Sequence, residues 1–336
     1  MTAQLTPDHP ANAAPYRPLA QFGFAWFVPV MGWIGLTMAW FQYPRSEPGI
    51  SAGAQLGTWI SVVVFVLVLL TNLIRAWRHP HALLADLRHP VRMAFTASFA
   101  IALILLGALG TTWGLADQVW VQATWWAGSL LEFSITVWVM SRCLRPADAG
   151  GLAWPAITPL LMIPIVGNVL VPLAGLHWPV FGWMSAQFGL GLFLWPLIVG
   201  VLLARMLQVG PLPARMTPTL FILVAPPSAI GLALLQWTAP PVLVWGCWGV
   251  ACLSMLWALS QWRAIQGLTF GMPHWGMSFP LAAFSALCLR LGQLPDGNWL
   301  LLPGQAAVWI TTAVILWLSF KSLQGLLDGR LLQPEG

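Results

Sequence analysis

Glu132 is the sole ionisable side chain deep inside an apolar stretch of this chain. A charge at the centre of a bilayer costs about 2.5–3.5 kcal/mol on insertion scales, so such a residue is by default a functional candidate. Its carboxyl group could carry a proton through the membrane. Alternatively, it could be neutral and hydrogen-bond backbone groups that a neighbouring bent helix leaves free. The residue therefore has either a proton-coupling role or a structural one.

The residue patterns of enzymes are missing from the sequence. It has no Walker loop, no His-Glu-x-x-His and no nucleophile elbow. The six histidines fall in the N-terminal tail, in loops or at the ends of apolar stretches, which argues against a haem held within the membrane. The four cysteines match no metal-site spacing, and we interpret them as packing residues. We expect no catalytic residue, no metal and no cofactor.

Three apolar stretches are interrupted by proline, glycine and polar residues. They are Thr158 to Asn168, with Pro164 and Gly167 between them, Thr217 to Ser228, with Pro226, and His274 to Pro280, with Ser278. Such breaks leave carbonyl groups unpaired at membrane depth, which lipid does not tolerate. These faces should therefore line the protein interior.

The composition shows what kind of element must hold these residues. Charged residues are 7% of the chain and hydrophobic residues are 59%, against a usual charged fraction of about 25%. The apolar runs are about 20 residues long and do not alternate as barrel strands would. The fold class is therefore an all-α integral membrane protein. We place about ten spans, roughly at 20–41, 55–76, 92–112, 118–141, 156–175, 179–207, 216–237, 241–262, 274–291 and 303–326.

Internal prolines fall mostly in alternate spans. Pro29 lies in the first span, Pro164 in the fifth, Pro226 and Pro227 in the seventh, and Pro280 in the ninth. The pattern is imperfect, because the third span has no proline and the sixth has one. A proline inside a helix removes a hydrogen bond and bends the helix. The pattern predicts an inner ring of bent odd helices, surrounded by straighter even helices that face lipid.

The basic residues indicate the orientation. Most of the arginines fall in the even-numbered loops and in the tails, and only Arg45 and Arg290 fall on the other side. By the positive-inside rule both termini are cytoplasmic. The net charge of +5 is thus a topology signal, and nothing suggests nucleic-acid binding. Short loops indicate one membrane domain at 19–328, with a disordered cytoplasmic tail at 1–18 and another cytoplasmic tail at 329–336.

Five short motifs resemble the tellurite-resistance/C4-dicarboxylate transporter family (TehA-type), which is related to the plant guard-cell slow anion channels. In chain order they are Pro29-Val30-Met31-Gly32, His89-Pro90-Val91-Arg92, Ile163-Pro164-Ile165-Val166-Gly167-Asn168, Ala225-Pro226-Pro227 and Ser278-Phe279-Pro280. Each motif is short, but together they cover spans one to nine in order.

The resemblance implies five helical hairpins around a central pore, three protomers in a homotrimer, and a phenylalanine that closes the pore at mid-membrane. That residue carries over to Phe279. Pro29, Gly32, Pro164, Gly167, Asn168, Pro226, Ser278 and Pro280 are then the pore-lining or helix-bending residues. Two departures bear on pore width: His274-Trp275 replaces the family's tandem tryptophans, and the third span lacks a proline.

The resemblance implies an anion channel in the plasma membrane, which is the bacterial inner membrane. An uncharged pore wall would select anions by ease of dehydration, and cytoplasmic arginines would raise the local anion concentration. The alternative is a secondary transporter of a small anion, such as a C4-dicarboxylate, sulfite or a tellurium oxyanion, with Glu132 as a proton carrier. The partners expected are therefore the lipid bilayer and small inorganic or organic anions.

Overall fold

The computed structural model describes residues 18–44 and 48–333, and within these ranges every regular element is a helix. The α-helices are α1 Phe27–Phe41, α2 Pro48–Arg78, α3 Pro80–Arg88, α4 Thr96–Thr112, α5 Val119–Cys143, α6 Ile163–Leu170, α7 Phe181–Val209, α8 Ala225–Gln236, α9 Pro241–Leu259, α10 Trp262–Gln266, α11 Ser278–Gly292 and α12 Leu301–Leu327. The 3₁₀-helices are η1 Pro18–Gln21, η2 Phe24–Trp26, η3 Arg92–Phe95, η4 Ala147–Ala149, η5 Trp154–Ala156, η6 Pro159–Met162, η7 Val171–His177, η8 Ala214–Val224, η9 Met272–Met277, η10 Pro295–Leu300 and η11 Arg330–Leu332. The prediction of an all-helical protein is confirmed.

Seven helical stretches in the described part of the chain are long and apolar enough to cross a membrane. They are Phe24–Phe41, Ala52–Arg78, Arg92–Thr112, Phe181–Val209, Ala214–Gln236, Pro241–Leu259 and Pro295–Leu327. Pro159–Ala174 is a shorter apolar helix. The two other long stretches are α5 and η9 with α11, which carry polar side chains such as Glu132 and Ser285.

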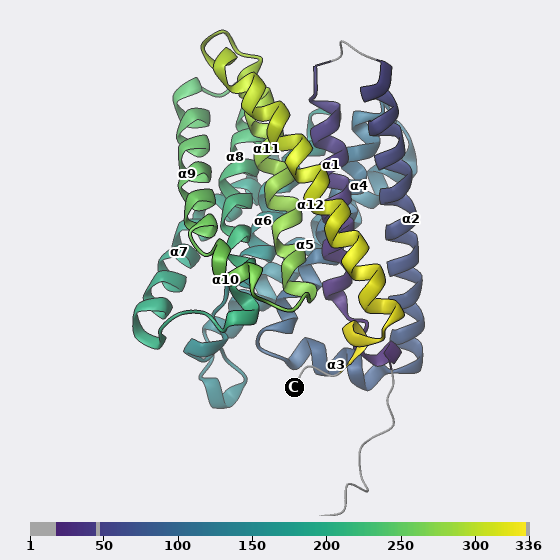
Figure 1. The fold of residues 1–336 in the computed structure, drawn as a ribbon, viewed down its shortest axis with the longest axis vertical. Helices are drawn as coiled ribbons and strands as arrows, with labels where there is room; N and C mark the ends of the chain where they lie inside the picture. The colour runs from purple at the N-terminus through teal and green to yellow at the C-terminus, as the bar shows by residue number, and fades with distance from the viewer. Residues whose placement is uncertain (1–17, 45–47, 334–336) are drawn as a thin grey trace, which may run out of the picture.

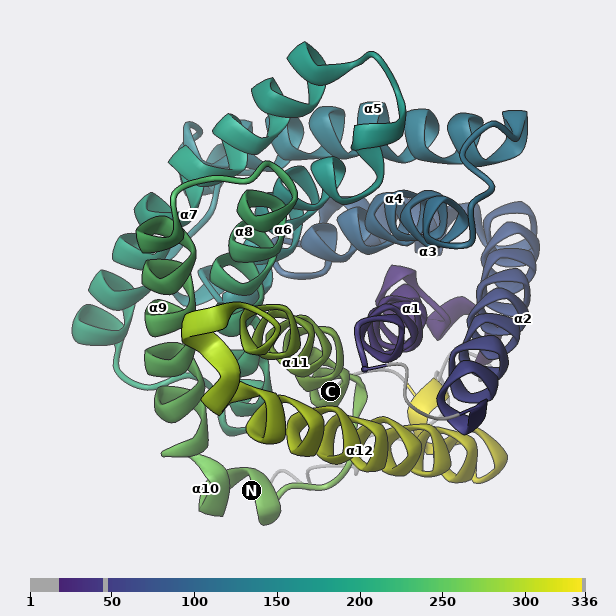
Figure 2. The same ribbon diagram turned by 90° about the horizontal axis from the view of Figure 1, so that it is seen from above.

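The helices differ sharply in how much of their surface the protein itself covers. In Phe24–Phe41 and Ala214–Gln236, 78% and 83% of the most apolar stretch is buried inside the protein. In Ala52–Arg78 the buried share is 11%. Seen from above, α2, α5, α7, α9 and α12 surround α1, α4, α6, α8 and α11 (Figure 2). The outer helices expose large apolar side chains such as Leu67 and Phe193, and an apolar outer surface is suited to lipid rather than water.

Prolines occupy the first turn of the inner α-helices rather than their middles. Pro29, Pro164, Pro226 and Pro280 are the third, second, second and third residues of α1, α6, α8 and α11. The first four N–H groups of an α-helix have no intrahelical partner, so proline removes no α-helical bond there. The interruption expected inside each helix is instead a 3₁₀ segment ahead of it. The inner helix α4 begins in the same way, with η3, although it has no proline.

Small residues let α4 and α5 approach closely. A Cβ atom placed on Gly107 would lie 2.8 Å from Cβ of Trp125, and one on Gly128 would lie 2.8 Å from the carbonyl oxygen of Ala100. Glycine at such contacts allows two helix backbones to pack directly, as is common between membrane helices. This contact joins an outer helix to an inner one (Figure 2).

Some residues on which the sequence made predictions lie outside the described ranges. They are the predicted tail at 1–18 except for Pro18, the part of the predicted tail at 329–336 beyond residue 333, and Arg45.

Candidate functional site

A small cavity lies at the centre of the inner helices, with a volume of about 30 Å³. It is lined by Val28, Met31, Phe95, Leu160, Ile163, Val166, Thr219, Ile222, Ala225, Met272, Pro273, Trp275, Gly276, Phe279 and Pro280. These residues come from α1, α6, α8 and α11 and from the 3₁₀ segments η3, η6, η8 and η9, and none is ionisable. Such a volume holds about one water molecule, so passage of a larger solute requires side chains to move.

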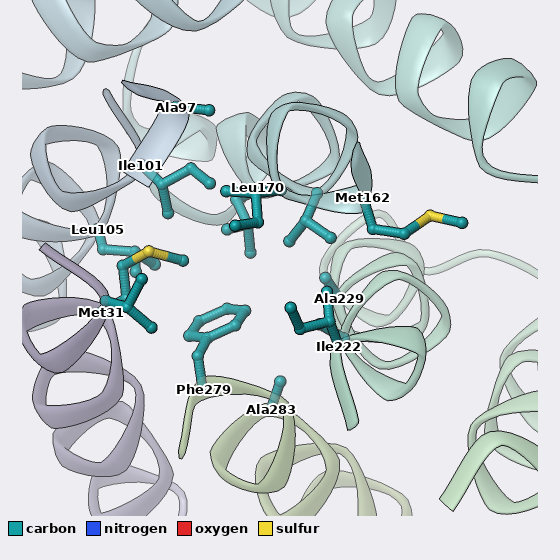
Figure 3. Close-up of a cluster of buried hydrophobic side chains, with 14 of the residues drawn as sticks. Met31, Ala97, Ile101, Leu105, Met162, Leu170, Ile222, Ala229, Phe279 and Ala283 are labelled. Atoms are coloured by element: carbon teal, nitrogen blue, oxygen red, sulfur yellow. The ribbon is translucent and has the colours of Figure 1, made fainter. Parts of the chain in front are cut away.

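The ring of Phe279 projects from the first turn of α11 into the space between the inner helices (Figure 3). Met31 of α1, Ile101 of α4, Leu170 of α6 and Ile222 of η8 surround it in this view. Only 5% of Phe279 is exposed. The phenyl ring therefore occupies the middle of an apolar cluster, with Pro280 beside it on the cavity wall.

Two glycines of α1 make room for α11 at this level. A Cβ atom on Gly35 would lie 3.0 Å from Cδ2 of Phe279, and one on Gly32 would lie 2.7 Å from Cβ of Ser278. The hydroxyl of Ser278 donates a hydrogen bond to the carbonyl oxygen of Trp275, at 2.8 Å. Gly32 and Ser278 thus contact each other at the α1–α11 interface and are not among the residues that line the cavity.

Helix α6 presents different faces to the cavity and to α5. Ile163 and Val166 line the cavity, and Leu170, one turn further on, points into the same cluster (Figure 3). Asn168 points to α5, where its Nδ2 donates to Oγ1 of Thr136 and to the carbonyl oxygen of Pro164, both at 2.7 Å. The amide of Asn168 therefore bridges α5 and α6 behind the cavity wall.

Glu132 lies at the same contact between α5 and α6, fully buried. A Cβ atom on Gly167 would collide with its carboxyl group, so the glycine makes room for the acid. Within the described ranges, neither carboxyl oxygen has a hydrogen-bond partner. Thr136 and Asn168, rather than Glu132, bond the carbonyl oxygen of Pro164. The sequence offered hydrogen bonding to freed backbone groups as the structural role of Glu132. In the structure, its neighbours Thr136 and Asn168 make these bonds instead.

A second polar contact lies one turn away, between α5 and α7. Nε2 of Gln187 donates to Oγ of Ser129 at 2.7 Å, and Nε1 of Trp183 donates to the same oxygen at 2.6 Å. Neither Gln187 nor Ser129 was expected from the sequence to be a site residue. Gln187 is a buried polar side chain in an apolar helix, and that signal could have identified it.

The remaining predicted residues, Pro29 and Pro226, are buried beside the cavity. Pro29 follows Val28 in α1, and Pro226 follows Ala225 in α8. Val28 and Ala225 line the cavity, whereas the two prolines do not. Of the predicted residues, the structure thus brings Phe279 and Pro280 together at the cavity and places the others in the shell of helix contacts around it.

An ion-pair cluster lies at the end of the molecule that carries α3. The sequence did not predict it. Oδ2 of Asp86 lies 2.6 Å from Nη2 of Arg75, and its Oδ1 lies 3.3 Å from Nη1 of Arg92. Arg75 and Asp86 are buried, and Nε of Arg75 also donates to the carbonyl oxygen of Ala20. The cluster ties α2, α3 and η3 together, and η3 also carries Phe95, a residue of the cavity wall. Spacing along the chain does not reveal it, because the three residues are brought together by folding.

Comparison with known proteins identifies the same kind of molecule. The family model described as "SLAC1: Voltage-dependent anion channel" matches residues 21–323. Two uncharacterized transporters of Methanocaldococcus jannaschii are 25% and 26% identical to this chain, in alignments that cover 80% and 78% of it and 84% and 81% of the relatives. A tellurite resistance protein TehA homolog of Haemophilus influenzae is 24% identical over 80% of this chain and 81% of its own length.

The family match includes every residue that lines the cavity, from Val28 to Pro280. The resemblance that the five motifs indicated is thereby confirmed. The chain is a multi-pass membrane protein, and it belongs to the SLAC1 voltage-dependent anion channel family.

Proposed function

We propose that this protein is an anion channel whose central pore is closed by Phe279. The observation that carries the proposal is the position of this ring, at the centre of an apolar cluster built by α1, α4, α6, α8 and α11. Membership of the anion channel family supports it. The pore would run along the axis of these five helices, through the cavity of about 30 Å³.

In this proposal ten helical segments span the membrane as five hairpins, and three protomers assemble as a homotrimer. Each hairpin pairs an inner segment with the outer one that follows it, such as α4 with α5. Both termini lie in the cytoplasm of a bacterium, and the protein resides in its inner membrane. The arginines at the cytoplasmic end would raise the concentration of anions near the pore entrance.

The pore wall would select anions weakly. Its lining residues are apolar except for the hydroxyl of Thr219 and backbone groups, and none is charged. An anion would therefore lose much of its hydration and gain only weak partners, which suits entry without trapping. The order of permeability among anions should follow the ease of dehydration.

Opening would require the phenyl ring to leave the pore axis. An aromatic ring in a narrow apolar constriction excludes both ions and water. Gly35 lies directly against the ring, so the ring cannot move towards α1 at that point without displacing the helix. A change of the Phe279 rotamer that carries the ring off the pore axis and away from α1 would open the path.

The decisive experiment is anion conductance of Phe279→Ala in planar bilayers, normalised to the protein present. The variant should conduct constitutively, whereas the wild type stays nearly closed. Phe221→Ala is the matched control, because Phe221 is also buried but does not line the cavity. Both truncations should cost about 3–5 kcal/mol of stability if they only create cavities.

A folded Phe279→Ala variant that conducts no better than wild type would exclude Phe279 as the gate. Equal currents from the Phe279→Ala and Phe221→Ala variants would attribute the current to a loosened core instead. Conductance in the first variant alone supports the channel.

The second candidate function is a secondary transporter of a small anion, such as a C4-dicarboxylate, sulfite or a tellurium oxyanion. The observation that favours it is the buried carboxyl group of Glu132, which has no partner among the described residues. A proton on this group would neutralise it within the membrane. Currents that grow linearly with driving force indicate a channel, whereas uptake that saturates and depends on a pH gradient indicates a transporter.

A further inference from the structure

A large groove opens on the side of the molecule between α2 and α5, with a volume of about 720 Å³. This volume falls in the range of about 300–1,000 Å³ that ligand pockets occupy. One face of α2, formed by Leu69, Asn72, Leu73 and Ala76, makes one wall. One face of α5 makes the other, with residues Leu131, Ile135, Trp138 and Arg142. Figure 2 shows α3 and α4 between these two helices.

The body of the groove is apolar. Its lining includes the rings of Phe27 and Phe99 and three leucines of α3. Two polar side chains of the lining, Asn72 and Thr96, already bond backbone carbonyl oxygens. Nδ2 of Asn72 donates to the carbonyl oxygen of Val68, and Oγ1 of Thr96 donates to that of Met93. Most of the groove therefore offers a ligand only hydrocarbon surface.

Two arginines stand together at the end of the groove where α3 and α5 finish. Arg88 is the last residue of α3, and Nη2 of Arg142 donates to its backbone carbonyl oxygen at 3.4 Å. Nε of Arg142 donates to the carbonyl oxygen of Gly150. These bonds occupy two of its five N–H donors. Among the described residues no carboxylate pairs with either guanidinium, and the nearby Asp86 is shared by Arg75 and Arg92.

We propose that this groove binds an anionic phospholipid, with an acyl chain along the apolar walls and the phosphate on Arg88 and Arg142. The proposal rests on charge complementarity at one end and apolar lining along the rest. Two unpaired guanidiniums suit a phosphate, because arginine presents its donors in a planar fork. A soluble anion would leave the apolar walls uncovered, whereas a phospholipid covers both parts. Helix α2, which forms one wall of the groove, is little covered by the rest of the protein, so membrane lipid can reach it.

The occupied groove would back the wall of the central cavity. Phe27 lies in the groove and its neighbour Val28 lies in the cavity; likewise Thr96 lies in the groove and Phe95 lies in the cavity. The wall between the two spaces is therefore a single layer of η3 and the start of α1. The phospholipid site itself does not depend on whether the cavity conducts anions.

The test is native mass spectrometry of the purified protein, titrated with phosphatidylglycerol or with phosphatidylcholine of the same acyl chains. The wild type should retain phosphatidylglycerol preferentially. An arginine near an anionic headgroup contributes about a fivefold gain in affinity. The variant R88Q/R142Q should thus lose roughly twenty-five-fold in affinity for phosphatidylglycerol and little for phosphatidylcholine.

Two further variants complete the test, one as a control outside the groove and one in its apolar part. Arg263→Gln is the control, because it removes an exposed arginine of α10, a helix that contributes no residue to the groove. Helix α10 lies at the same end of the molecule as α3 (Figure 1), and this variant should retain both lipids as the wild type does. Ala76→Trp fills the apolar groove without touching the arginines and should lower retention of both lipids. Thermal unfolding in detergent confirms that each variant is folded.

Equal retention of both lipids by the wild type, or unchanged retention by R88Q/R142Q, would overturn the proposal. Full displacement of phosphatidylglycerol by glycerol phosphate at low excess would assign the arginines to a soluble anion instead. A change in the number of associated copies in Ala76→Trp, with lipid retention unchanged, would assign the groove to contact between copies of this chain.

Discussion

At the scale of single residues, buried polar groups at one helix contact differ in whether they have hydrogen-bond partners. Asn168 and Thr136 satisfy each other and the carbonyl oxygen of Pro164 between α5 and α6. Glu132 shares that contact, yet its carboxyl oxygens have no partner among the described residues. A buried polar atom without a partner costs about 1–3 kcal/mol, so a neutral carboxyl group is the form that this site tolerates best.

Glu132→Gln tests whether that carboxyl group carries protons. The amide keeps the shape of the acid and its capacity to hydrogen-bond, but it cannot titrate. If the role is structural, the variant should fold and pass anions as fast as the wild type, with or without a pH gradient. The measurement is anion flux into proteoliposomes of matched protein content.

Loss of gradient-driven uptake in a folded Glu132→Gln variant would contradict the structural role and favour a transporter. Gly167→Ala serves as a control for packing, because its methyl group would collide with the carboxyl group of Glu132. It should lower stability without creating any new dependence on pH.

At the scale of elements, the 3₁₀ segments before α1, α4, α6, α8 and α11 set the geometry of the centre. Each inner helix changes from 3₁₀ to α close to the level of the cavity, and prolines stand in the first α-helical turn of four of them. Phe95, Leu160, Ile222 and Gly276 line the cavity from these 3₁₀ segments. A 3₁₀-helix is narrower and rises faster than an α-helix, so these segments place their side chains differently from a continuous helix.

The ion-pair cluster of Asp86 holds three of these elements together, and Asp86→Asn should weaken it. The change leaves the guanidinium of Arg75 buried without its charged partner. Breaking a buried pair in this way costs about 3–5 kcal/mol. The expected result is a marked fall in thermal unfolding temperature in detergent.

The matched control is Asp328→Asn, which removes the pair between Asp328 and Arg330 at 2.6 Å. Both partners of that pair are more than half exposed, and exposed pairs contribute about 0–1 kcal/mol. If the two variants were equally stable, the buried cluster would not hold α2, α3 and η3 in place.

At the scale of the whole molecule, several arginines gather at one end of the helix bundle. Arg75, Arg88 and Arg142 lie where α2, α3 and α5 finish, and Arg263 lies in α10. Figure 1 shows α3 and α10 at the same end of the bundle. By the positive-inside rule this end should face the cytoplasm.

Cysteine labelling tests the orientation in a background where Cys143, Cys247, Cys252 and Cys288 are replaced. Asp148→Cys, beside the basic end of α5, should react with a membrane-impermeant maleimide only after cells are permeabilised. Asp296→Cys, in η10 between α11 and α12, is the control and should react in intact cells. Both positions are exposed in the structure. Labelling of Asp148→Cys from outside would reverse the orientation.

The sequence predicted the helices well, because long apolar runs with few charges have only one stable form in lipid. The expected segments at 92–112, 118–141 and 241–262 correspond to Arg92–Thr112, Val119–Cys143 and Pro241–Leu259. The five motifs also identified the family correctly. These features depend on local composition and on short stretches of chain, which a sequence displays directly.

Tertiary structure alone decided which face of each helix meets which neighbour. The sequence predicted that Asn168 and Gly167 face the protein interior. Only the fold placed them against α5, with Ile163 and Val166 on the cavity. Asp86 joined Arg75 and Arg92 in the same way. In a helix that is apolar all round, periodicity does not distinguish its faces. The rotation of each helix is therefore set by close contacts such as Gly35 on Phe279, which exist only once the helices have packed.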